Sequence, residues 1–188
     1  MSIEIEHLQQ RLETLRGTLG AAPEEAYPDE RFSFIACEEA FFALREGNYG
    51  VGCVLVGSAD EILMRGHNRV FYPYFRSEAH AEMEVMNAAE DRHRDGIAWR
   101  HCVLYCSLEP CPMCLARLIV ARVGTVRYVA PDSGGGMANR TDALPVSFRN
   151  LAKGQTFAQA RCSPEMRELA SQVFLSNLQE LRQKLFDR

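Results

Sequence analysis

Two short segments of the 188-residue chain carry the side chains best suited to chemistry. The first is the run HAE, in which His80 precedes Glu82 by two positions. The second is the run PCPMC at 110–114, in which Cys111 and Cys114 are three positions apart. If this run opens a helix, both sulfur atoms lie on one face of its first turn, where the helix dipole favours thiolates. An imidazole and two thiolates suit one zinc ion per chain, so His80, Cys111 and Cys114 are the expected metal ligands.

A set of three protein ligands predicts a catalytic zinc site rather than a structural one. Structural zinc is closed by four protein ligands, whereas catalytic zinc keeps a position for water, whose pKa falls to about 7. Glu82 is close enough in sequence to reach that water without becoming a ligand, and a carboxylate there is suited to proton transfer. We therefore expect Glu82 to be the catalytic acid and base.

The elements that must position these residues are predicted from apolar spacing and turn signals. Helices are expected over 3–19, 29–46, 79–94 and 111–122, and strands over 51–57, 62–68, 102–107 and 125–130. Asp29 and Ser163 are the expected N-caps of two helices, the second of which runs nearly to Arg188 as one long helix. Between Ala130 and that helix we expect loops, including the glycine run at 134–136.

The arrangement predicts one main domain with a short N-terminal addition. Residues 1–28 form a helix followed by a linker at 21–28 that is rich in proline and small residues, and residues 29–188 form the domain. Strands and helices alternate in the middle of the chain, which favours right-handed crossovers and a parallel arrangement of strands there.

Charge and composition restrict the class of protein. The formal net charge of −4 argues against a protein whose main task is to hold nucleic acid through its phosphates. The sequence begins without a basic segment followed by an apolar one, and no apolar run approaches transmembrane length. We therefore expect a cytoplasmic protein with no membrane partner, whose seven cysteines are metal ligands or core residues rather than disulfides.

Together the two runs fit the pattern H-x-E…P-C-x-x-C, the signature of zinc deaminases that act on bases. The chain resembles the cytidine deaminase superfamily. Its run SLEPCPMC at 107–114 is similar to the branch that holds bacterial guanine deaminases and tRNA-specific adenosine deaminases. The resemblance extends over about 30–130 and includes VGCVLV at 51–56 and GHNR at 66–69. It implies an α/β fold, a three-layer α/β/α sandwich around a five-stranded mixed sheet, and a homodimer.

The resemblance also implies which residues contact the substrate. Asn68 and the backbone N–H of Ala81 would hydrogen-bond the base. Val51 stands where guanine deaminases of this family usually carry a phenylalanine that stacks on the purine, and where tRNA adenosine deaminases usually carry valine. Val51, Asn68 and Ala81 are therefore the expected substrate-binding residues.

The expected reaction is hydrolytic removal of an exocyclic amine, with release of ammonia, in purine or pyrimidine metabolism. The acidic composition and the absence of a basic tail favour a free base, a nucleoside or a related heterocycle as the small-molecule substrate. The alternative is a tRNA-specific adenosine deaminase that converts adenosine to inosine, which Val51 and arginines 65, 69 and 76 favour. A non-catalytic RNA-binding protein or a structural zinc module is disfavoured, because neither needs an acid–base glutamate beside a three-ligand metal.

Two other features have less specific interpretations. The aromatic residues Phe71, Tyr72, Tyr74 and Phe75 crowd one segment before His80, where they either pack locally or at a subunit interface, or stack on a base. The remaining histidines, His67 among them, lack the spacing of metal ligands and are expected to be ordinary surface or loop residues.

Overall fold

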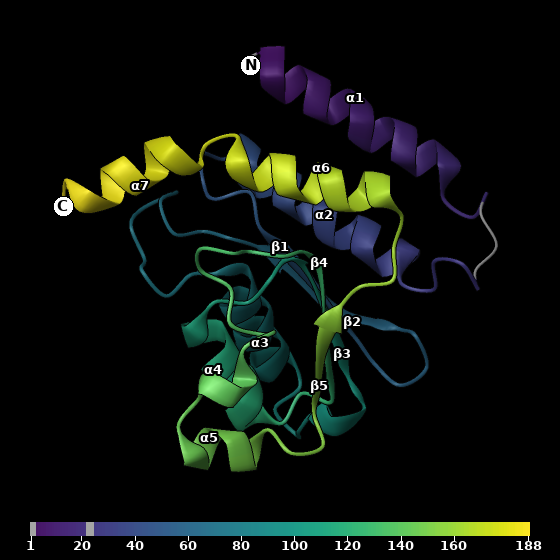
Figure 1. The fold of residues 1–188 in the computed structure, drawn as a ribbon, viewed down its shortest axis with the longest axis vertical. Coiled ribbons are helices and arrows are strands. Elements are labelled where there is room, and N and C mark those ends of the chain that lie inside the picture. Colours follow the sequence, from purple (N-terminus) through teal and green to yellow (C-terminus); the bar gives the residue numbers. More distant parts are fainter. Residues whose placement is uncertain (1–2, 22–24) are drawn as a thin grey trace.

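The computed structural model describes residues 3–21 and 25–188, which form a five-stranded sheet with helices on both faces (Figure 1). The strand order is β2-β1-β3-β4-β5. The strands are β1 (Gly52–Val56), β2 (Ile62–His67), β3 (Val103–Leu108), β4 (Thr125–Ala130) and β5 (Thr156–Gln159).

The sheet is mixed, because β1 runs opposite to both of its neighbours. Strand β1 pairs antiparallel with both β2 and β3, placing Cys53 opposite Cys106. Strands β3, β4 and β5 are parallel to one another. A helix connects β3 to β4, as parallel neighbours require. The expected five-stranded mixed α/β fold is therefore confirmed, including the parallel part.

The helices form layers on the two faces of the sheet. They are α1 (Ile3–Thr18), α2 (Glu30–Arg45), α3 (Ala81–Arg92), α4 (Pro112–Ala121), α5 (Val146–Leu151), α6 (Pro164–Leu175) and α7 (Leu178–Phe186), with short 3-10 turns at Trp99–His101 and Thr141–Ala143. Helices α2 and α6 lie together on one side of the sheet, and α3 and α4 lie on the other (Figure 1). Helix α1 packs outside α2 and α6, burying Leu8 and Leu12.

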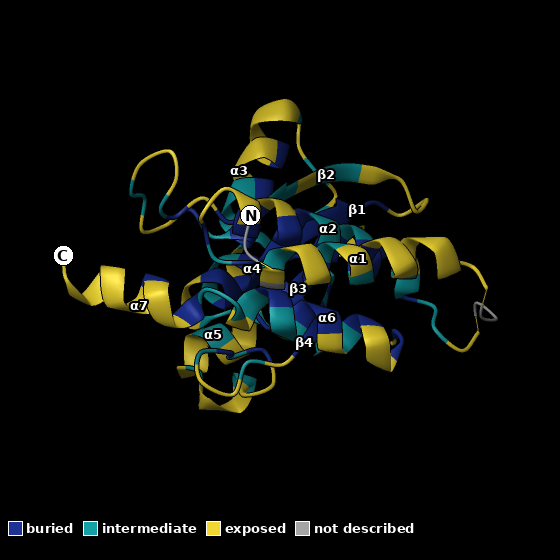
Figure 2. Cartoon of the chain, turned by 90° about the horizontal axis from the view of Figure 1, so that it is seen from above, coloured by how far each residue is buried: buried dark blue, intermediate teal, exposed yellow. Residues whose placement is uncertain are grey.

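Because both faces are covered, the central strands are buried throughout. Every residue of β1 is buried, as are all residues of β3 except Val103, which is half-buried. Figure 2 shows the buried residues concentrated at the centre of the molecule, with exposed residues on the outer helices. This burial explains why these strands read as continuous apolar runs rather than as alternating ones.

The C-terminal third differs from the expectation. Helix α5 and strand β5 occupy the segment expected to be loops. Strand β5 has only four residues and lies at the sheet edge with none of them fully buried, so its sequence carries no periodic apolar signal.

The prediction of one continuous C-terminal helix is also wrong. The helix breaks at Ser176 and Asn177, two residues with modest helix propensity. The side-chain Nδ2 of Asn177 donates a hydrogen bond of 2.7 Å to the backbone oxygen of Asn48, which holds the break against the loop after α2. The break allows α7 to leave the direction of α6 (Figure 1).

The two expected N-caps differ in outcome. Ser163 caps α6, because its hydroxyl accepts a hydrogen bond from the backbone N–H of Met166. Asp29 occupies the N-cap position of α2 without a side-chain cap bond. Its buried carboxylate instead accepts hydrogen bonds from the Tyr105 hydroxyl at 3.1 Å and the Arg161 backbone N–H at 2.7 Å. Asp29 therefore ties α2 to β3 and to the segment after β5.

The division of the chain at residue 28 stays a prediction. Residues 22–24 of the expected linker at 21–28 lie outside the described residues. Among the helices that the structure describes, none is both long enough and apolar enough to cross a membrane.

Candidate active site

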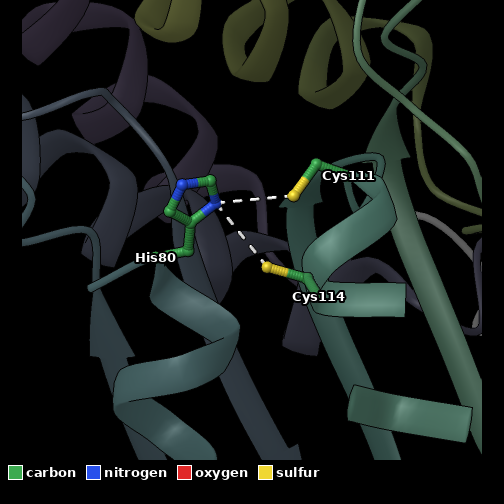
Figure 3. A group of neighbouring side chains, drawn as sticks. All are labelled: His80, Cys111 and Cys114. Atoms are coloured by element: carbon green, nitrogen blue, oxygen red, sulfur yellow. Dashed lines mark hydrogen bonds between the residues drawn. The ribbon is translucent and has the colours of Figure 1, made fainter. Parts of the chain in front are cut away.

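Three side chains from two helix starts converge at one point. His80 is the N-cap residue of α3, Cys111 is the N-cap residue of α4, and Cys114 lies in the first turn of α4. The Nδ1 atom of His80 lies 3.6 Å from the Sγ of each cysteine (Figure 3). All three ligand atoms lie within 4.8 Å of one another. The helical spacing predicted for the two cysteines therefore places both sulfurs toward the same histidine.

The donor set and its spacing fit zinc. Bond lengths of about 2.3 Å to sulfur and about 2.0 Å to nitrogen, at a tetrahedral angle, put nitrogen and sulfur roughly 3.6 Å apart. The separations of 3.6 Å from His80 Nδ1 to Cys111 and Cys114 match this geometry. Within residues 3–21 and 25–188, no other His, Cys, Asp or Glu joins the group. The site therefore offers zinc three protein ligands, as the sequence predicted.

The surroundings favour an anionic sulfur in this group. A hydrogen bond from Cys114 lowers the pKa of Cys111 to about 4, and His80 acts in the same direction. Burial disfavours the charged form of His80, but its hydrogen bond with Cys111 and the nearby Glu82 raise the pKa of the imidazole overall. Thiolate is the form of cysteine that binds metal.

A cavity of about 230 Å³ opens over this group. His80, Cys111 and Glu82 lie at its wall, whereas Cys114 is fully buried behind it. The other lining residues come from five further parts of the chain: Tyr49, Val51, Asn68, Leu108, Glu109, Asp132, Phe174, Leu178, Arg182 and Leu185.

Glu82 is placed for proton transfer inside this cavity. It lies in the first turn of α3, is only 3% exposed and lines the cavity beside His80. Burial raises the pKa of its carboxyl group, and the neighbouring Cys111 raises it further. A buried carboxyl group that contacts the substrate space is a suitable proton donor and acceptor.

The three expected substrate-binding residues lie in or next to the cavity. Val51 and Asn68 line it and are both buried. The Asn68 Oδ1 accepts a hydrogen bond from the Val70 backbone N–H, and no described residue accepts one from its Nδ2, which leaves that donor for a ligand. Ala81 is fully buried at the start of α3 and is not one of the lining residues.

Sequence reasoning missed Glu109 and Asp132, two acidic residues that line the cavity. Glu109 is 3% exposed, and its carboxylate accepts backbone N–H bonds from Asp132 and Asn139. A Cβ at Gly136 would lie 2.4 Å from the Glu109 carboxyl carbon, so this close approach requires glycine. Glu109 directly precedes the PCPMC run, and this position is the one sequence signal that could have identified it as a site residue. The glycine run is a loop, as expected, and it packs against these acids.

Sequence reasoning also missed the wall formed by the last two helices. Phe174 of α6 and Leu178, Arg182 and Leu185 of α7 all line the cavity. Within α7, Leu178, Arg182 and Leu185 are spaced by four and three residues, which is the spacing of one helical face. A helical stripe of this kind gives no sign of which surface it covers, and the break at Ser176–Asn177 was not foreseen.

Within the aromatic segment, Phe71 and Phe75 pack locally, whereas Tyr72 and Tyr74 are exposed, at 53% and 65%. The ring of Phe71 lies 5.5 Å from that of Tyr49 and 5.7 Å from that of Phe75. None of its four aromatic residues lines the cavity, although Tyr49 does.

His67, expected to be an ordinary surface or loop residue, is instead held at the end of β2 by two acids. Its Nδ1 lies 2.8 Å from Glu39 and its Nε2 3.2 Å from Glu46. The ring is therefore a structural contact between β2 and α2.

Comparison with known proteins connects this site to a family. The model of the cytidine and deoxycytidylate deaminase zinc-binding region matches residues 26–130. The tRNA-specific adenosine deaminase of Bacillus subtilis (strain 168) is 39% identical over 110 residues, which are 57% of this chain and 65% of that protein. The tRNA-specific adenosine deaminase of Aquifex aeolicus (strain VF5) is 33% identical over 111 residues, covering 57% of this chain and 69% of that protein. The chain thus spans less than two thirds of the B. subtilis relative.

Solved structures show the same fold. One, from a study of A-to-I editing by tRNA:A34 deaminases at the wobble position of transfer RNA, has a TM-score of 0.59 and 27% identity, over 68% of this chain and 96% of that chain. A guanine deaminase from Nitrosomonas europaea has a TM-score of 0.59 and 19% identity, over 81% of this chain and 84% of that chain. The second likeness supports the fold alone. The matched region of 26–130 contains the HAE and PCPMC runs and ends at the last residue of β4.

Proposed function

This chain belongs to the cytidine and deoxycytidylate deaminase family, and from this membership we propose that it removes the exocyclic amine of a small nucleobase, nucleoside or related heterocycle. It is a zinc-dependent hydrolytic deaminase, and His80, Cys111 and Cys114 would hold its zinc. In the overall reaction water forms a C–O bond at the ring carbon, the C–N bond breaks, and ammonia leaves.

The roles of the protein side chains follow from their positions. When bound, zinc lowers the pKa of a coordinated water to about 7 and so supplies a nucleophile at neutral pH. The Glu82 carboxylate takes a proton from the attacking water and returns it to the departing amine nitrogen. Asn68 holds the ring through its Nδ2 donors, and Val51 packs on the ring face. Ala81 offers its backbone N–H at the start of α3, where helix N–H groups lack intrahelical partners.

The wall formed by α6 and α7 is the observation that carries the choice of a small substrate. Phe174, Leu178 and Leu185 bring apolar surface to one side of the cavity. Its volume of about 230 Å³ is below the roughly 300–1,000 Å³ typical of sites for drug-sized ligands. A compact, partly walled cavity favours a base or a close derivative over a nucleotide inside a folded RNA.

The second candidate function is deamination of adenosine in tRNA. The B. subtilis and A. aeolicus relatives named above are both tRNA-specific adenosine deaminases. Val51 agrees with this alternative, and Arg69 lies exposed directly after Asn68. An RNA substrate would have to reach the site past α7. In the first candidate function α7 is a wall of the small-molecule cavity, whereas in the second the RNA must pass it.

We further propose a cytoplasmic homodimer. All seven cysteines are free, as suits a reducing compartment. Helix α4 exposes Met113 and Val120, at 37% and 61%, and these apolar side chains offer a surface for a second copy. Light scattering of the purified chain would give twice the mass of 21.2 kDa for a dimer and that mass for a monomer.

The proposed function is tested by measuring ammonia release from the purified, zinc-loaded protein. The panel contains free bases, nucleosides, nucleotides and a tRNA anticodon stem–loop, with the Glu82→Ala variant as the blank. Release from a small molecule and not from the RNA supports the proposal. Release from the RNA alone establishes the second candidate instead. Release from neither, with one zinc per chain present, contradicts both.

A further inference from the structure

The helices α6 and α7 lie outside the residues matched by the family, 26–130, and yet they form part of the active-site wall. Three of their four lining side chains are apolar, and the fourth is the cation Arg182. A charged group placed on an otherwise apolar wall suggests a specific partner, because polar groups at such sites usually fix the orientation of a ligand.

None of the residues that the structure describes pairs with the guanidinium of Arg182. It makes no hydrogen bond or ion pair with any residue of 3–21 and 25–188, and the residue is exposed. One of its terminal nitrogens lies 3.7 Å from where a Cβ on Gly134 would stand. Its charge also acts on Tyr49, opposing the rise that burial causes in the pKa of that phenol. Arg182 therefore sits between Tyr49 and the glycine run at the cavity.

The two acids that line the cavity together with Arg182, Asp132 and Glu109, accept hydrogen bonds from backbone amides. The Asp132 Oδ1 accepts hydrogen bonds of 2.9 and 3.0 Å from the N–H groups of Gly134 and Gly135. The two oxygens of Glu109 accept bonds of 3.1 Å from backbone N–H groups at Asp132 and Asn139. These contacts account for the Asp132 Oδ1 and for both oxygens of Glu109, and within residues 3–21 and 25–188 neither acid forms an ion pair with Arg182.

The helix that carries Arg182 is held at both ends. At its start, Asn177 donates to the backbone of Asn48 at 2.7 Å. At its end, the guanidinium carbon of Arg188 lies 3.7 Å from the centre of the Phe75 ring. Between them Leu181 is 2% exposed and anchors the inner face. Because the helix is held, the backbone that carries Arg182 is in place before a ligand arrives, which lowers the entropy lost on binding.

We propose that Arg182 binds a phosphate or carboxylate group carried by the small substrate, so that the chain acts on an anionic heterocycle rather than on a neutral base. This inference rests on the proposed function and specifies its substrate class. The planar guanidinium presents paired donors that match both of these anions in a bidentate manner. Phe174, Leu178 and Leu185 would then cover the uncharged part of the same molecule.

The test compares neutral and anionic members of matched pairs. The pairs are cytosine with 5-carboxycytosine, and cytidine, adenosine and guanosine with their 5′-monophosphates. Each is assayed with the wild-type chain and with Arg182→Gln, Arg182→Lys and Lys184→Gln. Lys184 is a matched control, because it lies on the same helix and carries the same charge but pairs with Glu180 at 2.6 Å and does not line the cavity.

The expected result is a preference for at least one anionic member that depends on Arg182. Arg182→Gln should lower kcat/KM for that compound by roughly 10- to 100-fold, the loss expected for a charged hydrogen-bonded contact. The neutral member should change by less than about twofold, Arg182→Lys should restore part of the loss, and Lys184→Gln should match the wild type. Equal use of both members, or an unchanged preference in Arg182→Gln, overturns the inference.

A binding measurement separates this inference from the proposed function. Calorimetric titration of the same pairs into zinc-loaded Glu82→Ala detects anion recognition without turnover. Absence of ammonia release from every compound would contradict the proposed function. The role of Arg182 would still be supported if the anionic member of a pair bound more tightly than the neutral one and if adding Arg182→Gln removed this difference. If Arg182→Gln weakened binding of a tRNA anticodon stem–loop and of no small molecule, the anion would belong to RNA and the small-molecule assignment would be overturned.

Discussion

The Nδ1 atom of His80 lies 3.6 Å from the Sγ of Cys111, although the two residues are 31 positions apart in the chain. Each is the N-cap residue of its own helix, α3 and α4, so the distance between them is fixed by two elements that pack on the same side of the sheet. A zinc ion held by His80, Cys111 and Cys114 would therefore join two helices as well as supply chemistry.

Removing one sulfur should release the metal and weaken this junction. We expect Cys111→Ala to lower the zinc content from about one equivalent to nearly none and to lower the melting temperature, because zinc then no longer links α3 to α4. Metal content is measured by elemental analysis and stability by thermal unfolding. Cys102→Ala is the matched control, since Cys102 is a buried cysteine outside the ligand group. Full zinc retention in Cys111→Ala would remove this residue from the ligand set.

Glu82 should be needed for turnover and not for metal binding. Glu82→Gln keeps the size and the burial of the side chain but removes its ability to carry a proton between water and the amine. We expect kcat to fall by roughly 10²- to 10⁴-fold or more, with one zinc per chain retained. Ammonia release and zinc analysis on the same preparation check both halves. Near-normal turnover would exclude Glu82 as the proton carrier.

The two ends of the Asn68 carboxamide should be separable. Asn68→Ala removes the Oδ1 acceptor of the Val70 N–H as well as the Nδ2 donor, whereas Asn68→Asp keeps an oxygen acceptor at that position. Both variants should lower kcat/KM, by roughly tenfold or more for a lost ligand contact, and Asn68→Ala should also unfold at a lower temperature. Unchanged kinetics in Asn68→Asp would mean that the Nδ2 group does not contact substrate.

His67 should make stability depend on pH in a defined direction. Hydrogen bonding to Glu39 raises the pKa of His67 above its ordinary value of about 6.5, and Glu46 adds to this rise against the effect of burial. The protonated ring is favoured in the folded chain, so its contribution to stability is fully present below about pH 6.5 and is lost as pH rises through the folded-state pKa. Arg65 also pairs with Glu39, at 3.2 Å.

The measurement is the difference in melting temperature between wild type and His67→Gln from pH 5.5 to 9. That difference should be largest at acidic pH and shrink as the ring of the wild-type protein loses its proton. A constant difference across the range would show that His67 acts through neutral hydrogen bonds alone.

The buried carboxylate of Asp29 should matter more than a surface acid. It accepts hydrogen bonds from the Tyr105 hydroxyl and the Arg161 backbone N–H, and it lies 4.0 Å from Arg127. Asp29→Ala would leave those donors unsatisfied and should lower the free energy of unfolding by about 2–3 kcal/mol. Tyr105→Phe removes only one of the bonds and should cost about 1 kcal/mol. Urea unfolding of both variants gives the comparison, and equal losses would contradict the assigned network.

The sequence predicted the central part of the molecule because its signals there are local. The helix spacing of Cys111 and Cys114 and the apolar run of β3 each depend on a few adjacent residues, and the structure places both as expected. The wall of the cavity depends instead on contacts between distant segments. Nothing near Arg182 in the chain indicates that it lines the same space as His80, because that placement follows from the bend at Asn177.

The same difference explains the errors in detail. Asp29 has the residue type of an N-cap, and only the approach of Tyr105 and Arg161 shows that its carboxylate is used elsewhere. Strand β5 is short and lies at the edge, so its pairing with β4 defines it better than its own composition does. Local propensity is a weak guide wherever tertiary contacts decide the outcome.

The position of Arg188 against Phe75 has a practical consequence for anyone who produces or modifies this protein. Arg188 lies just beyond the end of α7, the helix that contributes Leu178, Arg182 and Leu185 to the cavity wall, so a purification tag or fusion partner attached there would push on α7 and not on the zinc ligands. Tagged preparations should then be fully metallated but altered in substrate selectivity. The same separation makes α7 a natural region for laboratory evolution of selectivity, because its residues can vary while the hydrolytic centre on α3 and α4 stays unchanged.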